Sequence, residues 1–564
     1  MLTWIRTFFP TICIFAVPIA LSPILFLGSK ESSCVFCIAM LTCYWLTEVV
    51  PLSITSLLPM LLFPVLGIMS AKDTAQQYLK DTSMLLIITL IGAIAVEECQ
   101  LHRRIALNVL ARTGGRFHWT LLAFAGATAF VSFWLSDTAS TALMLPIAIA
   151  ALEAMELGEE EHGLKCFDSQ TDVTDIHFEY PEDRATHIRS LSRRNQGIWK
   201  CLVLVCSHAS LIGGTAIITS TAPNLIFKDV IESRYHEHGV KITYMTWMAF
   251  AFPPLVGYLL ASWVVLQISF LGPRSILAIF CRPSAEEAEK TAKMQKAIRK
   301  LWKALGPMTF AEKSVLSLYA VMIFAWMFRD PGFMPGWSSL LDPERRTLIS
   351  DSCVGILVVF AFFSWPRERP DILCWRTDSS KPPTSRKALL TWDSVHRKLP
   401  WSVVFLIGAG FAISQGVQKS GLSRAMTCVV IDTLRGSTPA EMQTLLTTAI
   451  TFFTETMSNG ATASIFIPIA LNIAETLRLH PFYLAIPAAI APSFAFMLPM
   501  ATPPNAIVYE TGTLRMWEMA MTGVFLNFLC IGVTVLNMNT WAYWFFDMGQ
   551  FPEGIQLGNG TDTC

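Results

Sequence analysis

The sequence is poor in charged residues, which make up only 15% of its 564 positions, whereas hydrophobic residues make up 53%. Soluble globular proteins have nearer a quarter charged residues, so this deficit indicates that much of the surface faces something other than water. The net charge is zero, so the chain lacks the basic character of a nucleic-acid-binding protein. Its fourteen cysteines do not supply two C-x-x-C pairs, and several lie in apolar runs, so we expect neither a zinc site nor a disulfide framework.

Long apolar runs account for the hydrophobic composition. The first run has no clear cleavage site and is interrupted by Pro10, Pro18 and Pro23, so we interpret it as a retained helix rather than a signal peptide. A spanning helix needs roughly 20 mainly apolar residues. The sequence predicts an all-α polytopic membrane protein with about eleven transmembrane helices, in segments 9–28, 34–50, 52–68, 83–99, 200–229, 246–271, 312–328, 350–365, 401–417, 482–510 and 519–546.

Two further apolar stretches, 119–155 and 441–477, do not have the pattern of simple spans. Each has two arms joined by a short polar motif, which is Ser136-Asp137-Thr138 in the first and Ser458-Asn459-Gly460 in the second. An arm of about 15 residues covers only about 22 Å, which is short of a hydrocarbon core of about 30 Å. We therefore expect two re-entrant helical hairpins that turn at the polar motifs. Two kinked ordinary spans are the alternative.

The two polar motifs belong to a longer repeat. Ser136 aligns with Ser458 and Asp137 with Asn459, at an offset of 458 − 136 = 322. Two other motifs recur in the same order: 90–93 as 406–409, both Leu-Ile-Gly-Ala, and 221–224 as 502–505, both Thr-x-Pro-Asn. The prolines of the second pair interrupt spans 200–229 and 482–510, which predicts two broken helices, although kinks that serve only packing are the simpler alternative.

The loop charges predict the orientation of these segments. Lys and Arg gather in 102–118, 274–303 and 367–398, so these loops and the N-terminus are expected in the cytoplasm. The C-terminal tail would then be extracellular, where the sequon at Asn559 is a candidate glycosylation site. Spans 83–99 and 401–417 would run in opposite directions, so the two halves are predicted to be inverted copies, as in many secondary transporters.

The predicted organisation has five parts, two of which are the inverted repeats. The first repeat contains a hairpin, a cytoplasmic loop at 156–197 and a broken helix, and the second contains a hairpin and a broken helix. The parts are N-terminal scaffold helices in 1–82, the first repeat in 83–271, cytoplasmic loops and connecting helices in 272–400, the second repeat in 401–546 and the extracellular tail in 547–564.

Four interrupted elements, two hairpin tips and two broken helices, are expected to converge on one centre. Broken helices present free N–H groups and positive dipole ends to anions, and free carbonyl groups to cations. None of the four interruptions contains Lys or Arg. The sequence therefore predicts a site for an anion together with Na⁺, in which hydroxyl groups, amides and helix ends hold the anion.

Motifs along nearly the whole chain resemble those of the divalent anion:sodium symporter family, the sodium-coupled di- and tricarboxylate and sulfate transporters of animals. The resemblance implies an elevator-type transporter of the plasma membrane, acting as a homodimer, with no cofactor besides the coupling Na⁺. The carboxylate branch is favoured because its typical Thr-Ala-Pro-Asn and Ala-Thr-Pro-Pro-Asn sequences occur at 221–224 and 501–505. The other motifs are Tyr44–Glu48 with Pro51-Leu52, Tyr78–Thr82, Val96-Glu97, Leu101–Leu107, Leu305–Met308, Arg329–Trp337 and Phe494–Pro499.

The resemblance also implies roles for particular residues. Those expected to contact the substrate, a succinate-like dicarboxylate or citrate, are Ser136, Asp137, Thr138, Thr221, Ser458, Asn459, Gly460 and Thr502. Those expected at two Na⁺ sites are Ser132, Asp137 and Ser220 at the first and Thr454, Asn459 and Ala501 at the second.

Three residues depart from the family pattern. Asp137 replaces a neutral amide, Ser220 replaces a glycine, and Gly460 is smaller than usual. A carboxylate about 4 Å from a substrate charge costs about 4 kcal/mol at an effective dielectric constant of 20, but it would strengthen a nearby cation site. We therefore expect Asp137 to alter coupling, through tighter Na⁺ binding, a proton in place of one Na⁺, or weak transport. A sodium–sulfate cotransporter is the other alternative.

An intramembrane enzyme and a channel are the alternatives to a transporter. An intramembrane enzyme would need a nucleophile with its base, or metal ligands, at membrane depth. His208 lies in an apolar span beside serines, where a packed histidine is the simpler interpretation, and Glu48, Glu97 and Glu455 have no His or Cys partner at motif spacing. Glu455, beside Thr454, is expected to orient the second hairpin. A channel is not excluded by inverted hairpins, but saturable uptake coupled to a cation would exclude it.

Overall fold

The computed structural model describes residues 2–47, 49–112, 116–157, 188, 190–235, 240–275, 285–331, 334–369, 387–422, 425 and 436–552. Within these ranges the regular secondary structure is helical, and β-pairing is limited to one isolated bridge between Pro366 and Ala388. The sequon at Asn559, residues 158–187 and 189 of the loop 156–197, and the tail from residue 553 lie outside the described residues.

The helices of the first half and of the second half follow the order expected from the sequence. The first half contains α1 (Leu2–Leu21), η1 (Ser22–Leu27), α2 (Lys30–Thr47), α3 (Leu52–Thr55), α4 (Leu58–Val65), α5 (Ala71–Tyr78), α6 (Asp81–Glu98), α7 (Leu101–Arg112), α8 (Phe117–Ser132), α9 (Asp137–Leu157), α11 (Arg193–Gly213), α12 (Ala222–Tyr235) and α13 (Tyr244–Leu271). The second contains α15 (Ala285–Ala304), α16 (Phe310–Met327), η5 (Trp337–Leu340), α17 (Pro343–Leu348), α18 (Asp351–Ser364), α19 (Trp392–Lys398), α20 (Trp401–Ser420), α22 (Pro439–Phe453), α23 (Asn459–Thr476), α24 (Pro481–Ile490), η6 (Ala491–Ser493), α25 (Pro503–Glu510), α26 (Met516–Met538) and α27 (Trp541–Phe545).

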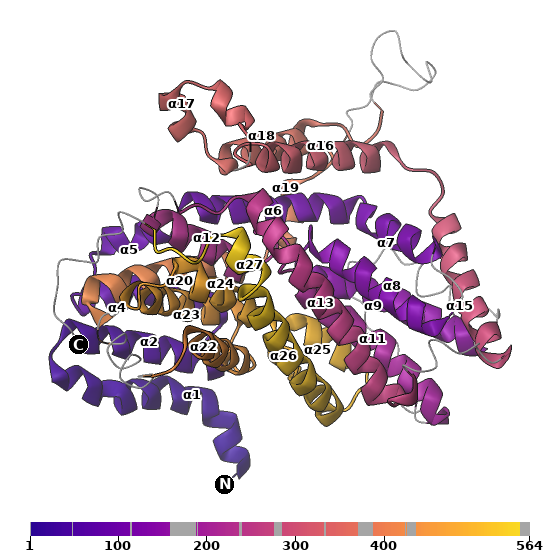
Figure 1. Ribbon diagram of the computed structural model, residues 1–564, viewed down its shortest axis with the longest axis horizontal. Helices are drawn as coiled ribbons and strands as arrows, with labels where there is room; N and C mark the ends of the chain where they lie inside the picture. Colours follow the sequence, from indigo (N-terminus) through magenta and orange to yellow (C-terminus); the bar gives the residue numbers. More distant parts are fainter. Residues whose placement is uncertain are drawn as a thin grey trace.

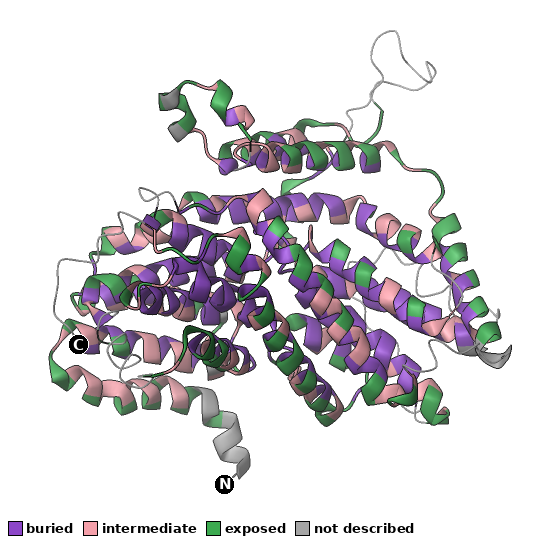
Figure 2. Ribbon diagram, viewed as in Figure 1, coloured by how far each residue is buried: buried purple, intermediate pink, exposed green. Residues whose placement is uncertain are grey.

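Several helices are able to cross a membrane. Seven of the described helical segments are long and apolar enough by length and composition: Ala71–Glu98, Asp137–Met155, Arg193–Gly213, Tyr244–Leu271, Phe310–Met327, Trp401–Ser420 and Met516–Phe545. Large apolar side chains are also exposed on outer faces, where Figure 2 shows green along α1, α13, α16 and α26; they include Ile19, Leu260, Phe324 and Phe528. Apolar surface of this extent fits contact with lipid rather than water.

Some expectations about local structure are wrong. Segments 102–118 and 274–303 were expected to be loops, but most of the first segment is the helix α7 and most of the second segment is the helix α15. Met294, Ile298 and Leu301 of α15 are buried at the spacing of one helix face, and α15 packs on α7 and α9. Charge therefore excluded a spanning helix there, but not an amphipathic one.

Two predicted apolar segments also differ in length or continuity. Segment 52–68 is two short helices, α3 and α4, rather than one span. The second arm of the first hairpin, α9, has 21 residues, where about 15 were expected. At 1.5 Å per residue it is about 32 Å long, so its length alone does not prevent it from crossing a bilayer.

The two hairpins and the two broken helices form the body of the fold. In Figure 1, α8, α9 and α11 extend to the right, α22, α23 and α24 lie to the left of them, α1 and α2 lie at the lower left, and α16, α17 and α18 form the upper edge. α8 and α9 pack against each other and against α11, and α22 and α23 pack against α24. The halves also interlock, because α12 packs on α23 of the other half and α25 packs on α9. This exchange brings both hairpin tips to both helix breaks.

Candidate functional site

The two hairpin tips have the same local structure. In the first, the Ser136 hydroxyl accepts a hydrogen bond from the N–H of Ala139 at 3.3 Å, and so caps the start of α9. In the second, the Ser458 hydroxyl accepts from the N–H of Ala461 at the same distance and caps α23. Each serine of the repeated motif therefore begins the returning helix of its hairpin.

A second pair of contacts ties each tip to the helix before the break. The Ser132 hydroxyl contacts Asp137 Oδ1 at 3.1 Å and the Ser210 carbonyl at 2.7 Å. The corresponding Thr454 hydroxyl contacts Asn459 Oδ1 at 3.1 Å and the Pro492 carbonyl at 3.0 Å. The residues predicted for each Na⁺ site from the hairpins are thus in direct contact within each half. The hydroxyl-bearing side chains of Ser132 and Thr454 are fully buried.

The asparagines that follow the breaks hold them open in the same way. Asn224 donates two hydrogen bonds, to the carbonyls of Gly214 at 3.0 Å and Ile217 at 2.9 Å. Asn505 donates to the carbonyls of Ala495 at 2.8 Å and Leu498 at 3.0 Å. The offsets are all equal, since 505 − 224, 495 − 214 and 498 − 217 each give 281. The amide side chain replaces the backbone donors that a continuous helix would have supplied at these carbonyls.

One cavity of about 810 Å³ contains the tips and the breaks. All eight residues predicted to contact the substrate line this cavity: Ser136, Asp137, Thr138, Thr221, Ser458, Asn459, Gly460 and Thr502. Of the residues predicted for the Na⁺ sites, Ser220 and Ala501 also line it, whereas Ser132 and Thr454 lie behind Asp137 and Asn459. The first residues of four helices, α9, α12, α23 and α25, line the wall. Because a helix N-terminus carries partial positive charge, this convergence favours an anion.

Two matched hydroxyl groups in the cavity wall have no protein partner. The Oγ1 atoms of Thr221 and Thr502 are buried, and neither forms a hydrogen bond within the described structure. A buried hydroxyl without a partner is destabilising, so a bound ligand that supplies one is favoured at both positions. The threonines occupy equivalent positions in the two halves, since 502 − 221 = 281.

The charged residues that line the cavity are paired. Glu97, Glu98, Arg397 and Lys398 line it at the C-terminal end of α6 and on α19, and the Arg397 side chain is 71% exposed, so this end is the mouth. Lys398 Nζ lies 2.9 Å from Glu97 Oε1 and 3.2 Å from Glu98 Oε1. Burial tends to lower the pKa of Lys398, but the two carboxylates outweigh it and raise that pKa above its ordinary value. The ammonium group therefore stays charged at neutral pH.

The three departures from the family pattern have structural explanations. Gly214 gives Asp137 its room, because a Cβ there would lie 2.5 Å from Asp137 Oδ1. The Ser220 hydroxyl donates to the Ile217 carbonyl at 2.7 Å. Ser220 is not among the described non-glycine residues with a positive φ, so this position does not need the conformational freedom of glycine. A Cβ at Gly460 would lie 3.2 Å from Leu406 Cδ2, so a larger residue would press on α20.

Glu455 contributes a feature that only the second half has. It is 3% exposed, and its carboxylate accepts hydrogen bonds from the N–H groups of Met497 and Leu498 and from the Asn527 amide, at 2.9 to 3.2 Å. The equivalent position in the first half, 455 − 322 = 133, is Phe133. The carboxylate thus fixes the extended backbone of the second break to the second tip.

Other residues near the site were not singled out by the sequence. The Ser207 hydroxyl donates to Asn505 Oδ1 and joins α11 to α25. The Tyr319 hydroxyl donates to the Trp134 carbonyl at 3.0 Å and ties α16 to the first tip. Isolated Ser and Tyr in apolar helices carry no pattern that would reveal such contacts.

His208 is fully buried, with Nδ1 3.3 Å from the Ser262 hydroxyl and its ring 5.2 Å from that of Phe496, as expected of a packed histidine.

Comparison with known proteins identifies the family. A family model described as the sodium:sulfate symporter transmembrane region matches residues 3–548. The chain belongs to this family. A sodium-dependent high-affinity dicarboxylate transporter 2 of Caenorhabditis elegans is 43% identical over 99% of this chain and 98% of its own length. The human Na⁺/dicarboxylate cotransporter 3 is 37% identical over 96% and 93%, and the rat Na⁺/citrate cotransporter is 35% identical over 98% and 98%.

The family assignment confirms the resemblance found in the sequence. The relatives are sodium-dependent transporters of dicarboxylates and citrate by name, and the family is one of membrane transporters. Carboxylates are thus the substrates named for these relatives, whereas the family model is named for sulfate.

Proposed function

We propose that the protein is a secondary active symporter that carries di- or tricarboxylates, such as succinate, malate, 2-oxoglutarate or citrate, across the plasma membrane with Na⁺. The observation that carries this proposal is the convergence of four helix N-termini, with the unpartnered hydroxyls of Thr221 and Thr502, on one cavity. At the tips and breaks this wall offers hydroxyl and N–H donors to carboxylates but no Lys or Arg, because the cationic side chains of the lining, Arg397 and Lys398, belong to the mouth. The compensating positive charge is then the coupling Na⁺.

The two Na⁺ ions are proposed to bind behind the hairpin tips. Ser132, Asp137 and Ser220 supply oxygen atoms in the first half, and Thr454, Asn459 and Ala501 supply them in the second. In this proposal hydroxyl, amide, carboxylate and backbone carbonyl oxygens are the ligands, which suits a hard cation. The matched contacts Ser132–Asp137 and Thr454–Asn459 support it. In the first half Asp137 adds a full negative charge.

The proposed transport cycle is an elevator motion of inverted repeats. The capping and tip contacts recur at an offset of 322 and the asparagine contacts at an offset of 281, which supports two copies of one unit, each with a re-entrant hairpin and a broken helix. We propose that these units form the moving part of each protomer of a homodimer, with the N-terminus in the cytoplasm and the C-terminus outside. Non-helical backbone at membrane depth is tolerated in such an arrangement because it is buried in protein or lines the cavity.

Uptake of labelled substrates tests this function. Cells that express the protein are expected to take up succinate or citrate saturably in Na⁺ medium, and at background level when choline replaces Na⁺. Asn459→Ala, expressed at the same surface level, is the matched negative control because it removes a proposed ligand of substrate and cation. Sulfate uptake without carboxylate uptake would favour the sulfate alternative, and Na⁺-independent, non-saturating flux would favour a channel.

Glu455→Gln is expected to weaken activation by Na⁺ more than substrate affinity. The glutamine amide would direct an NH₂ group at backbone N–H donors and lose at least one hydrogen bond. A hydrogen bond lost at a buried site costs about 1–3 kcal/mol. The Na⁺ concentration for half-maximal uptake is therefore expected to rise roughly tenfold. Uptake measured over a range of Na⁺ concentrations at saturating substrate checks this. Glu510→Gln, at an exposed position on nearby α25, is the control and is expected to leave the Na⁺ dependence unchanged.

A further inference from the structure

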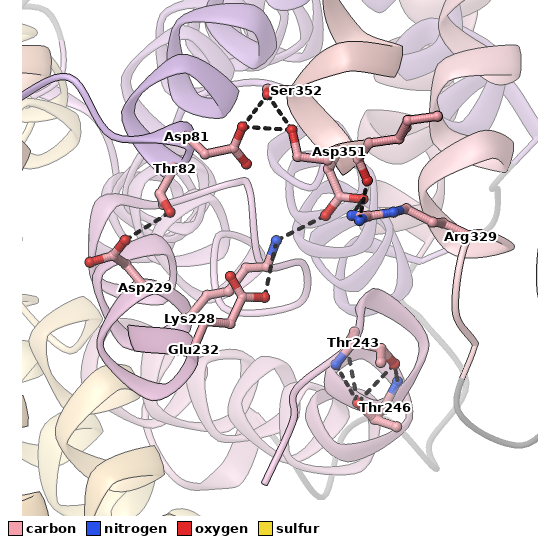
Figure 3. Close-up of polar contacts among 12 residues, drawn as sticks. Asp81, Thr82, Lys228, Asp229, Glu232, Thr243, Thr246, Arg329, Asp351 and Ser352 are labelled. Carbon is pink, nitrogen blue, oxygen red and sulfur yellow. Dashed lines mark hydrogen bonds and ion pairs between the residues drawn. The ribbon is translucent and has the colours of Figure 1, made fainter. Parts of the chain in front are cut away.

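A buried ion cluster joins α12 to the helices at the edge of the fold (Figure 3). Lys228 of α12 places Nζ 2.9 Å from Asp351 Oδ2 at the start of α18, and Arg329, just after α16, places Nη1 2.7 Å from Asp351 Oδ1. The side chains of Lys228 and Asp351 are only 7% and 9% exposed. Glu232 lies 3.6 Å from Lys228 one turn along α12. Three separate elements therefore meet at one carboxylate.

The next residue of α12 makes a second ion pair, with a different neighbour. Asp229 Oδ2 lies 3.0 Å from Lys80 Nζ, and Asp229 Oδ1 accepts a hydrogen bond from the Thr82 hydroxyl at 3.0 Å, both at the start of α6. Asp81, between them, accepts hydrogen bonds from the hydroxyls of Ser350 and Ser352 at the start of α18. The starts of α6 and α18 are thus joined to each other and to α12.

The cluster lies at the end of α6 opposite the cavity mouth. α6 runs from Asp81, in the cluster, to Glu98, at the mouth, so its 18 residues span about 27 Å between the two. The wall between them includes Tyr244 and Trp326, which both line the cavity and stack with ring centroids 5.7 Å apart. Lys228 Nζ lies 5.3 Å from the Tyr244 ring, and Trp326 Nε1 donates to the Asp351 carbonyl at 2.9 Å. The cluster therefore backs the closed end of the cavity.

We propose that the residues Lys80, Lys228, Asp229, Arg329 and Asp351 form an ionic latch, which holds the cavity shut at this end while its mouth is open at the other. The latch joins α12, an element of the proposed moving part, to α6, α16 and α18. For the substrate to leave through the closed end, α12 must separate from these helices and the ion pairs must break. This inference rests on the proposed transport cycle, in which the cavity opens alternately to the two sides.

Ion pairs are suited to a contact that forms and breaks in every cycle. Within the closed wall, the attraction between the charges offsets the cost of removing them from water, so the net stabilisation is small. When the wall opens, each group regains its hydration, and the open state is not penalised as it would be by an exposed apolar patch. Removing one partner has a different effect in the closed state: Lys228→Gln leaves Asp351 paired with Arg329 but without its second cation, and Asp229→Asn removes the ion pair with Lys80. Neutralising variants are therefore expected to shift the balance towards opening.

Distance measurements between spin labels test the latch. The labels are placed at Ser233→Cys on α12 and Leu348→Cys at the end of α17, both exposed positions, with the other reactive cysteines replaced by serine and the protein in liposomes. Without ligands, the unsubstituted latch is expected to give mainly one short distance. Lys228→Gln and Asp229→Asn are each expected to raise the population of a second, longer distance about tenfold.

Lys200→Gln is the matched control. Lys200 forms an ion pair of 2.6 Å with Glu518, and both side chains are largely buried, but this pair joins α11 to α26 away from the latch. The control is expected to leave the distances unchanged. If a single variant does not fold, the exchanged pair Lys80→Asp with Asp229→Lys restores an ion pair of opposite polarity and is expected to restore the short distance.

Two results would overturn the latch. One is the same distance distribution in Lys228→Gln and Asp229→Asn as in the parent protein, and the other is an equal shift in Lys200→Gln. The measurement uses no substrate, so it can fail while Na⁺-driven succinate uptake is normal. Conversely, absent uptake with a clear shift in distance would overturn the proposed function and not the latch.

Discussion

Replacing Asp137 with asparagine is expected to raise the Na⁺ concentration for half-maximal uptake at least tenfold. A full charge about 4 Å from a bound cation contributes about 4 kcal/mol at an effective dielectric constant of 20, and the neutral amide removes it. Asparagine keeps the shape of the side chain and can still accept the hydrogen bond from Ser132. The effect therefore isolates the charge from the geometry. Uptake at a series of Na⁺ concentrations, in both proteins at equal surface expression, is the measurement.

The pH dependence of the same pair separates two forms of altered coupling. If a proton replaces one Na⁺ at Asp137, uptake by the unsubstituted protein changes with external pH, and uptake by Asp137→Asn does not. If Asp137 only binds Na⁺ more tightly, the variant changes the Na⁺ dependence and leaves the pH profile alone. Identical Na⁺ and pH profiles in the two proteins would show that Asp137 has no part in coupling. Asn459→Asp, at the equivalent position of the second half, tests whether a charge there acts in the same way.

Replacing Asn505 with alanine is expected to reduce uptake to a few per cent or less. The variant leaves the carbonyls of Ala495 and Leu498 and the Ser207 hydroxyl without their partner, and each buried polar group left unpaired costs about 1–3 kcal/mol. The open backbone before α25 would then rearrange, and the wall around Thr502 with it. Asn505→Asp is expected to fail equally, because a carboxylate cannot donate to the two carbonyls.

Asn224→Ala provides a graded comparison for Asn505→Ala. Asn224 makes the same two contacts in the first half, but its own Oδ1 has no partner, so alanine there leaves two groups unpaired rather than three. A smaller loss of uptake and of thermal stability is expected. Surface biotinylation corrects uptake for expression, and the unfolding midpoint of the purified proteins reports stability. Full uptake by either alanine variant would contradict the role given to these asparagines.

The sequence predicted the parts of the fold that depend on hydrophobicity and on the repeat. Long apolar runs predicted most of the helices near their observed bounds, with segment 52–68 as an exception. The recurrence of Thr-x-Pro-Asn located both breaks, because proline interrupts a helix wherever it lies inside one. Ser136 and Ser458 were recognisable as tip residues because they are polar residues between apolar arms. All of these signals are local along the chain.

The remainder depends on contacts between distant residues. The amphipathic helix α15 was mistaken for a loop because its charge hid the apolar stripe of Met294, Ile298 and Leu301. The pairing of Lys228 with Asp351 joins residues 123 positions apart, and no local pattern indicates it. Position 214 needs a glycine because its backbone lies close to Asp137, and only the packing of α11 against the first hairpin reveals this contact. Tertiary proximity, rather than residue type, decides these features.

Accumulation of labelled succinate by purified protein in sealed liposomes tests the central claim most directly. Liposomes loaded with choline and placed in Na⁺ medium receive an inward Na⁺ gradient as the only driving force. We expect internal succinate to rise transiently above the external concentration and to fall back when an ionophore dissipates the gradient. Equilibration without accumulation, or accumulation that is equal with choline outside, would contradict Na⁺-coupled carboxylate transport by this protein.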